Sequence, residues 1–148
     1  MSIKAQLRED LKDAMRAQDA QRRSALRMVL TAIQLAEAES PHDLTDDEIV
    51  GLVQKEVKRR EEAVEMMRQA GRDELVAAEE LELKILRGYL PPQLSEDEVR
   101  ELAQAVIAEV GATSTRDLGR VMGALMPRVQ GQADGRVVNQ VVRDLLSV

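Results

Sequence analysis

The chain has 148 residues, of which 44% are hydrophobic and 32% charged, and its formal net charge is −6. It contains no cysteine, which excludes disulfides, thiol catalysis and thiolate metal sites, and its net acidity argues against a dedicated DNA-coating protein. The N-terminus has no apolar h-region and nowhere do 18 apolar residues run together, so we expect a soluble, cytoplasmic protein with no membrane partner.

Four longer helices are predicted in the first part of the chain. The composition is rich in helix formers, and aromatic residues, which favour strands, are nearly absent: Tyr89 is the one tyrosine, and there is no Phe or Trp. The second helix, over residues 20–39, is apolar on two sides, which is typical of a central helix in a bundle. A capping box at Thr45 and Glu48 opens the third helix, and a fourth follows over residues 73–87. The first helix is marked by Ile3, Leu7, Leu11, Ala14 and Met15. The two sides of the second carry Leu26, Val29, Leu30 and Ile33, and Ala25, Met28, Ala32 and Leu35.

The segment "GYLPPQLS" is the clearest boundary in the sequence. Pro91 and Pro92 cannot continue a helix, and the residue before a proline is pushed towards extended geometry. We therefore predict an all-α protein in which an N-terminal bundle of about four helices, residues 1–90, is joined by a proline hinge to a C-terminal three-helix domain, residues 91–148.

Three shorter helices are predicted after the hinge. A second capping box, at Ser95 and Glu98, starts the fifth helix, and Gly111 caps its C-terminus. Asp134 is placed as the N-cap of the seventh helix. The sixth helix carries Leu118, Val121, Met122, Leu125, Met126 and Val129 on its apolar side, and the seventh carries Val137, Val138, Val141, Val142, Leu145 and Leu146.

Two charged residues fall within apolar stripes. Arg60 lies between Val57 and Val64 in the third helix, and Glu82 lies within the stripe of the fourth helix. Because charges in a core must pair or neutralise, we predict an Arg60–Glu82 ion pair. The catalytic alternative, two carboxylates for acid–base work, has no nucleophile or cofactor motif nearby, so no catalytic residue, metal site or cofactor is assigned. The stripe around Glu82 is formed by Ala78, Leu81, Ile85 and Leu86.

Four of the eight glycines fall within residues 119–142, in the sixth and seventh helices and the turn between them. On a helical wheel Gly123 points away from the apolar stripe of the sixth helix and Gly119 lies at its flank. A mid-helix glycine costs about 1 kcal/mol relative to alanine, and its use on an outer face is to let another backbone approach. Arginines beside such a gap suit phosphate, because the guanidinium group binds it with two hydrogen bonds.

Two interpretations of this face remain open. In the first, Gly131 and Gly135 cap helices, while Gly119 and Gly123 are tolerated or contact the fourth helix. In the second, the sixth and seventh helices present a backbone-accessible surface, rich in arginine, to nucleic acid. The lack of aromatic residues argues against base stacking on single strands, so the ligand would be structured RNA recognised by its shape and phosphates.

Four segments in order resemble the GatB/YqeY family: "LKDAMRAQDAQRRSALRMVLTAIQLAE", "KRREEAVEMMRQAGRDEL", "YLPPQLSEDEV" and "DLGRVMGALMPRVQGQADGRVVNQVVRDLL". The resemblance extends from about Leu7 to Leu146 and implies a helical N-terminal domain and a small three-helix C-terminal domain. The family comprises stand-alone proteins of this length and the tail of the B subunit of the tRNA-dependent amidotransferase. That enzyme converts misacylated Glu-tRNA(Gln) or Asp-tRNA(Asn) to the amide, with glutamine as nitrogen donor.

The resemblance implies that the tail helps to hold tRNA, whereas kinase and amidase chemistry lie elsewhere in the enzyme. This chain lacks the catalytic cradle of the B subunit and the amidase Ser-Ser-Lys arrangement. A family label of carbon–nitrogen ligase activity with glutamine as amido-N-donor, the enzymatic alternative, would then be inherited by name rather than by active site. The residues that match the family's C-terminal motif by position are Gly119, Gly123, Gly131, Asp134, Gly135 and Asn139.

We therefore expect a non-catalytic, tRNA-associated accessory protein; the alternative is a protein-docking subunit of an aminoacyl-tRNA amidotransferase or synthetase. Phosphate contacts would fix the orientation of the RNA without reading its bases. The sequence assigns no oligomeric state. The candidate phosphate contacts are Arg116, Arg120, Arg128, Arg136 and Arg143, and a weaker second patch comprises Arg22, Arg23, Arg27, Lys58 and Arg59.

Overall fold

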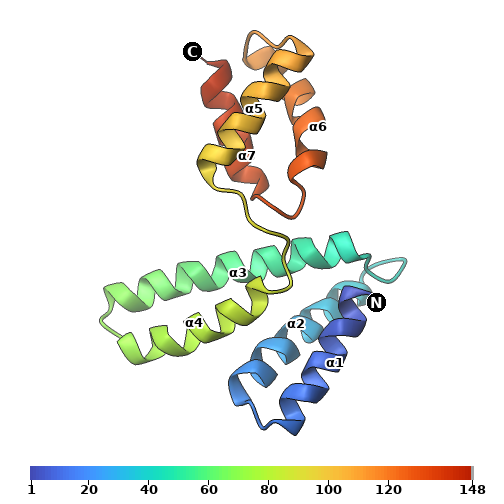
Figure 1. Cartoon of the computed structure of the whole chain (residues 1–148), viewed down its shortest axis with the longest axis vertical. Coiled ribbons are helices and arrows are strands. Elements are labelled where there is room, and N and C mark those ends of the chain that lie inside the picture. Colours follow the sequence, from blue (N-terminus) through green and yellow to red (C-terminus); the bar gives the residue numbers. More distant parts are fainter. Residues whose placement is uncertain (148) are drawn as a thin grey trace. The chain divides into compact units, whose positions relative to one another are not determined.

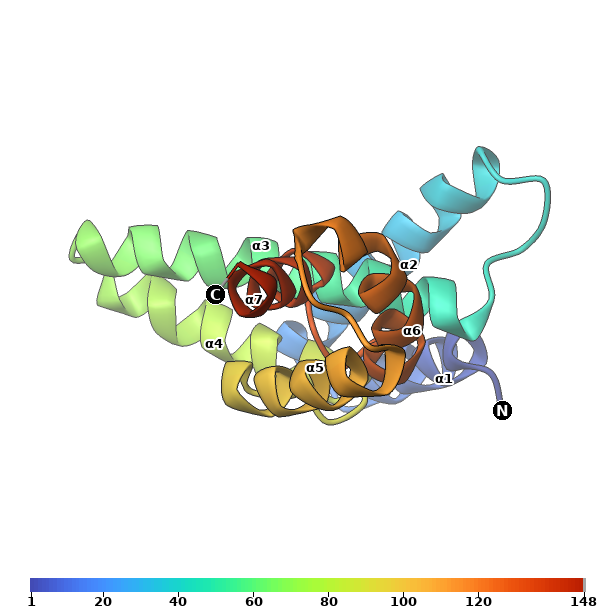
Figure 2. The ribbon, with the colours of Figure 1, turned by 90° about the horizontal axis from the view of Figure 1, so that it is seen from above.

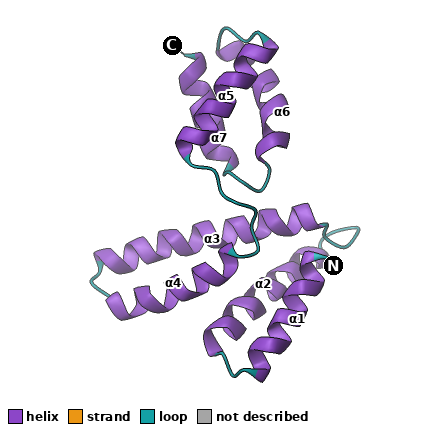
Figure 3. Ribbon diagram, viewed as in Figure 1, coloured by secondary structure: helices purple, strands orange, loops and turns teal. Residues whose placement is uncertain are grey.

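A computed structural model describes residues 1–147. These residues form seven α-helices, one short 3-10 helix and no strand (Figure 3), so the prediction of an all-α protein is confirmed. The chain divides into two compact units, Met1–Leu90 and Pro91–Val148. Within the described part of the chain, no helix is both long enough and apolar enough to cross a membrane.

The N-terminal unit contains α1 (Ile3–Arg16), α2 (Ala20–Ala38), α3 (Asp46–Gln69) and α4 (Asp73–Arg87). Antiparallel pairs form between α1 and α2 and between α3 and α4, and α2 contacts all three of the other helices (Figure 1). The predicted capping box opens α3: Thr45 Oγ1 accepts a hydrogen bond from the Glu48 N–H at 3.2 Å, and Glu48 Oε1 accepts one from the Thr45 N–H. The largest side chains in the core of the N-terminal unit are Leu7, Leu26, Ile33, Ile49, Leu83 and Leu86.

Four residues of this unit that were predicted on apolar helix sides are exposed: Met15, Met28, Leu35 and Leu81. Leu35 on α2 is 66% exposed, whereas Ala25, on the same predicted side, is fully buried, so the neighbouring helices cover only part of that side. Leu81 on α4 is 54% exposed, and the buried side of that helix runs through Glu82, Leu83 and Leu86 instead.

Arg60 is buried where α3 packs against α4. Its Nη1 atom donates to Glu82 Oε2 at 2.6 Å and to Glu79 Oε2 at 3.1 Å. Its Nη2 atom lies 3.1 Å from the sulfur of Met28. The guanidinium therefore joins the α3–α4 pair to α2, while carboxylates of α4 balance its charge.

The C-terminal unit contains α5 (Glu96–Val110), the 3-10 helix η1 (Thr115–Asp117), α6 (Leu118–Val129) and α7 (Gly135–Leu146). Each of the three α-helices contacts the other two (Figures 1 and 2). Gly111 ends α5 in the left-handed region at φ +67°, a conformation that glycine adopts without strain. The buried residues of this unit are Val99, Ala103, Val106, Val121, Leu125, Val129, Val138, Val141, Val142 and Leu146.

The segment after the two prolines is bound to the C-terminal unit. The Leu94 N–H donates to the Gln132 carbonyl at 2.8 Å, and Gln93 Nε2 donates to the Gly131 carbonyl at 2.8 Å. These bonds attach the entry to α5 to the turn between α6 and α7.

Candidate nucleic-acid interface

Helix α6 has a buried side, which packs into the core, and an outer side opposite to it. Val121, Leu125 and Val129 recur every four residues and are buried, which is the spacing of a single helix face. Gly119, Arg120 and Gly123 are exposed. We call this side, together with Arg116 in η1, the α6 face.

Neither glycine of the α6 face is required for packing within the fold. A Cβ atom built at Gly119 or Gly123 meets no heavy atom within 4 Å among the described residues. Each glycine nevertheless costs the helix about 1 kcal/mol relative to alanine. No neighbouring atom therefore requires a glycine at either position for packing, whereas the helix backbone there is open to a ligand.

Pro127, which did not enter the sequence-based prediction, lies in the last turn of α6. Proline has no N–H, so the carbonyl of Gly123, four residues earlier, loses its usual helical donor. Gly123 is exposed and carries no side chain that could cover this oxygen. The Gly123 carbonyl therefore lacks the helical donor that residue 127 would otherwise supply. A proline four residues after a glycine in an otherwise helical pattern could have revealed this feature in the sequence.

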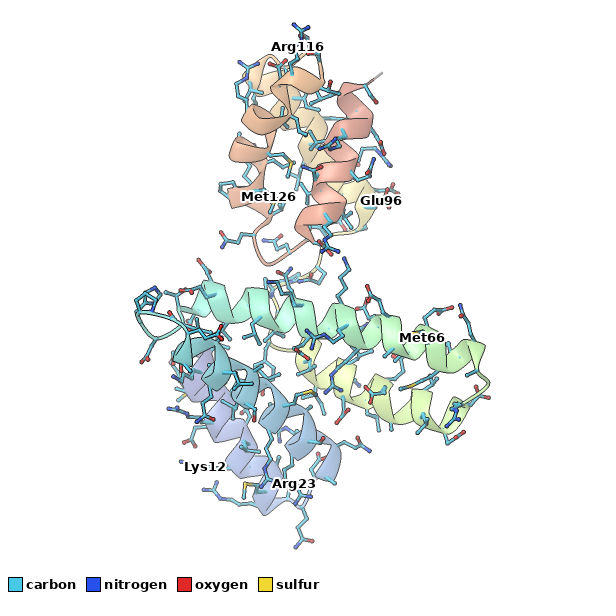
Figure 4. The ribbon with its side chains drawn as sticks, turned by 180° about the vertical axis from the view of Figure 1, so that it is seen from behind. Lys12, Arg23, Met66, Glu96, Arg116 and Met126 are labelled. Atoms are coloured by element: carbon cyan, nitrogen blue, oxygen red, sulfur yellow. The ribbon has the colours of Figure 1, made fainter. Side chains whose placement is uncertain are left out.

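The two arginines of the α6 face are held differently. Arg116 is exposed, and its guanidinium makes no hydrogen bond or ion pair with any described residue; Figure 4 shows its side chain pointing away from the helices. Arg120 is 55% exposed and lies 3.3 Å from Asp117 Oδ1. Asp117 also accepts hydrogen bonds from the N–H groups of Thr113 and Ser114, and these bonds, that of Thr113 first, lower the pKa of its carboxyl group. Arg120 is thus oriented while its other nitrogen atoms still face solvent.

The loop that carries Arg116 is fixed by a capping box that the sequence-based prediction missed. Ser114 Oγ accepts a hydrogen bond from the Arg116 N–H, and Asp117 closes the box on the N–H of Ser114. The spacing of a serine and an aspartate three residues apart was the signal available in the sequence.

Arg128 already has a partner within the unit. Its Nη2 and Nη1 atoms lie 2.6 and 3.3 Å from the two carboxylate oxygens of Glu109 on α5. This hydrogen bonding raises the pKa of Arg128 and lowers that of Glu109. A phosphate would have to displace a two-pronged carboxylate to bind Arg128, so this arginine is a weaker candidate than Arg116 and Arg120.

The polar side of α7 begins at its N-cap. Asp134 accepts a hydrogen bond from the Arg136 N–H at 2.8 Å, and Gly135 and Arg136 are exposed in the first turn. One turn later, Arg143 Nε donates to Asn139 Oδ1 at 2.8 Å, which fixes both side chains. Gly135 and Arg136 thus remain open to a ligand, whereas the Arg143–Asn139 pair is ordered.

Gly131 does not belong to this surface. It is buried, adopts φ +77°, and its carbonyl accepts the hydrogen bond from Gln93. The prediction that Gly131 contacts a ligand is therefore corrected. Glycine occurs at this position because the α6–α7 turn requires a positive φ there.

The predicted second basic patch is divided between two helices. Arg22, Arg23 and Arg27 belong to α2, whereas Lys58 and Arg59 belong to α3. Arg22 lies 3.8 Å from Asp10, and Arg59 lies 3.2 Å from Glu56. Figure 4 shows the side chain of Arg23 on the outside of the N-terminal unit. No group of three or more His, Asp or Glu residues with the geometry of a metal site occurs within residues 1–147.

Comparison with known proteins identifies the family. The family described as "Yqey-like protein" matches residues 4–146, nearly the whole chain. The chain belongs to the YqeY-like family. The resemblance proposed from the four sequence segments is thereby confirmed.

Three of the relatives of this YqeY-like chain bear on its function and location. It is 29% identical over 143 residues to "Altered inheritance of mitochondria protein 41, mitochondrial" of Pyrenophora tritici-repentis, covering 95% of this chain and 78% of the relative. The protein of the same name from Eremothecium gossypii is 31% identical over 140 residues, covering 92% and 72%. A shorter match, 33% identical over 60 residues, links 38% of this chain to 10% of a Methanospirillum hungatei protein that is named as a subunit of glutamyl-tRNA(Gln) amidotransferase.

The expectation of a cytoplasmic protein is contradicted by these relatives, because the first two are named as mitochondrial proteins. A missing apolar h-region argues only against a secretory signal peptide. Mitochondrial transit peptides are amphipathic and rich in arginine and serine, so that test does not address them.

Proposed function

We propose that this YqeY-like protein is a non-catalytic accessory protein that holds structured RNA, and specifically tRNA, against the α6 face. The observation that carries the proposal is the pair of exposed glycines with open space around them, flanked by Arg116 and Arg120. The short match to a protein named as part of a glutamyl-tRNA(Gln) amidotransferase supports tRNA as the RNA in question.

The contacts at this face would be made to the sugar–phosphate backbone. Arg116 and Arg120 would each bind a phosphate through their guanidinium groups, and Gly119 and Gly123 would let the RNA backbone come close to the helix. The Gly123 carbonyl that Pro127 leaves without a helical donor could accept a hydrogen bond from a ribose 2′-hydroxyl group. Such contacts position an RNA without reading its sequence.

The charge of the whole chain limits this binding. A net charge of −6 repels nucleic acid at a distance, so binding depends on the few arginines of the α6 face. We expect modest affinity that falls steeply with salt, since each phosphate contact releases counterions.

The test is tRNA binding by the purified protein across a salt series, with two variants of the α6 face. Arg120→Glu should weaken binding by about tenfold and lower the slope of log K against log salt by about 1. Gly123→Leu should weaken binding at every salt concentration by blocking the approach of the backbone. Glu109→Gln should have the opposite effect and strengthen binding, because it releases Arg128.

The two variants of the α6 face have matched controls. Arg100→Glu makes the same change of charge on α5 of the same unit, and Gly51→Leu fills another open position, in α3. Both controls should bind tRNA as the unchanged protein does. If no binding occurs at low salt, or if the controls weaken it as much as the variants, the proposal is wrong.

A protein helix is the second candidate for the ligand of this face. Met122 and Met126 flank the glycines and are only partly buried, which gives a partner helix some apolar surface to contact. In that case Gly123→Leu would abolish the interaction while Arg120→Glu would have a small effect, and the protein would not bind tRNA.

A further inference from the structure

A groove of about 510 Å³ runs between α1 and α2 in the N-terminal unit. Its floor is apolar and includes Leu11, Leu30 and the buried Ile33. This volume falls within the range of small-molecule sites and exceeds what a single phosphate group needs.

Two stripes of polar residues form the walls. Lys4 and Arg8 lie one turn apart on α1, and Arg27 and Thr31 lie one turn apart on α2. Residues four apart share one face of a helix, so each wall presents its polar groups along the same line. Gln34, one further turn along α2, adds an amide to the second wall.

The one carboxylate in the groove is fully engaged. Glu37 Oε1 accepts a hydrogen bond from Lys4 Nζ at 2.6 Å, and Glu37 Oε2 accepts one from the Leu44 N–H at 2.9 Å. Glu37 therefore pairs directly with Lys4, and Arg8 adds only a weaker Coulombic attraction to the same carboxylate. Within residues 1–147 neither arginine is within 4 Å of a carboxylate, and the one contact of the Arg27 guanidinium is the Met15 sulfur at 4.0 Å.

We propose that this groove binds a phosphate group, held between the guanidinium groups of Arg8 and Arg27. Arginine pairs strongly with phosphate through parallel N–H donors, and the Thr31 hydroxyl and Gln34 amide supply neutral donors on the same wall. The apolar floor favours a ligand that carries carbon next to the phosphate, as a phosphate ester does. The ester is either a small molecule such as a mononucleotide or the backbone of an RNA.

The proposed site is independent of the α6 face, because it lies in the other unit and uses different residues. It also differs from the second basic patch predicted from the sequence, which contained Arg27 but neither Lys4 nor Arg8. If RNA is the source of the phosphate, the protein holds it at two places, one in each unit.

The experiment follows backbone amide signals of the full chain by NMR while inorganic phosphate and then adenosine monophosphate are added. Shifts should be concentrated in residues 4–11 and 27–37 and should saturate at concentrations on the order of 10 mM or lower. Arg8→Gln and Arg27→Gln should each abolish saturation. The control Arg16→Gln, on the same helix as Arg8 but outside the groove, should leave it unchanged.

A variant that should bind phosphate more tightly provides a test in which loss of folding cannot produce the expected result. Glu37→Gln keeps an acceptor for the Leu44 N–H but releases Lys4, so phosphate should bind several times more tightly. If these probes cause no saturable shifts along the groove, or if Glu37→Gln weakens their binding, the proposal is overturned.

tRNA binding separates the two sources of the ester. If Arg8→Gln and Arg27→Gln also weaken tRNA binding, the phosphate belongs to RNA. If both small probes saturate while tRNA binding is unchanged or absent, the groove serves a small phosphate ester. The latter result supports the groove even where the proposed function of the α6 face fails.

Discussion

Arginine occupies opposite environments at the α3–α4 interface and on the α6 face. Arg60 is buried and its charge is balanced by Glu82 and Glu79, with a methionine sulfur beside it. Arg116 and Arg120 are exposed, next to glycines at which an added Cβ atom would meet no heavy atom within 4 Å in the described part of the chain. The surroundings of an arginine indicate its use: a buried guanidinium must be neutralised within the fold, whereas an exposed one keeps its donors for a ligand.

The largest expected effect is on stability at the buried site. Arg60→Met leaves the Glu82 carboxylate buried without its cation and should lower the free energy of unfolding by about 3–5 kcal/mol. Arg120→Glu, on the α6 face, should change it by less than about 0.5 kcal/mol. Urea denaturation followed by circular dichroism measures both.

A double variant shows whether the cost at Arg60 comes from the unpaired charge. Arg60→Met combined with Glu82→Leu removes both charges and should recover most of the lost stability, since apolar residues can replace a buried pair. A single variant at Arg60 that is as stable as the unchanged protein would contradict this account of the interface.

Alanine at two glycines should have opposite effects within the C-terminal unit. Gly111→Ala places a side chain at φ +67° and should destabilise the protein by about 1–2 kcal/mol. Gly123→Ala has open space and a helical position, so it should stabilise by up to about 1 kcal/mol.

Thermal unfolding of the two alanine variants and of the unchanged protein measures whether each substitution raises or lowers stability. If Gly123→Ala raises stability but weakens tRNA binding, this glycine is retained for the ligand rather than for the fold. Destabilisation by Gly123→Ala would instead reveal a packing role.

The smallest expected effect appears at high pH and concerns Tyr89. Its hydroxyl donates to Asp10 Oδ2, and burial, followed by this hydrogen bond, raises the pKa of the phenol well above its usual value of about 10. The protonated phenol is favoured in the folded state, so its contribution to stability is complete below pH 10 and is lost as the pH rises further. Tyr89→Phe should remove this part of the pH dependence.

The titration has a clean signal because Tyr89 is the one tyrosine in a chain without tryptophan. Tyrosinate absorbance should develop only when the protein unfolds at alkaline pH. Ionisation of the folded protein near pH 10 would contradict the raised pKa.

Local features of the fold were predictable from the sequence. The capping boxes at Thr45 and Ser95 and the glycine cap at Gly111 depend on neighbouring residues, and all three are present in the structure. Which apolar side chains are buried was harder to predict, as the exposed Leu35 and Leu81 demonstrate. Periodicity gives a helix its apolar side, but the surrounding helices decide how much of that side is covered.

In the candidate site, too, some features were predictable from the sequence and others depended on packing. A helical wheel placed Gly123 and Arg120 on the outer side of α6, because the spacing of Val121, Leu125 and Val129 fixes the inner side. It could not exclude Gly131, whose burial follows from the Gln93 hydrogen bond across the unit, nor detect that Glu109 of α5 engages Arg128. The phosphate groove depends on which residues of α2 face Lys4 and Arg8.

The helices, their caps and the outward direction of the α6 face follow from the order of residues alone, because these features depend on contacts within about four residues of the chain. Which charges outside the core are neutralised, and which remain available, depends on how the helices pack. Glu37 pairs with Lys4 and Glu109 with Arg128 across 33 and 19 residues of the chain, so these partners meet only when the helices pack.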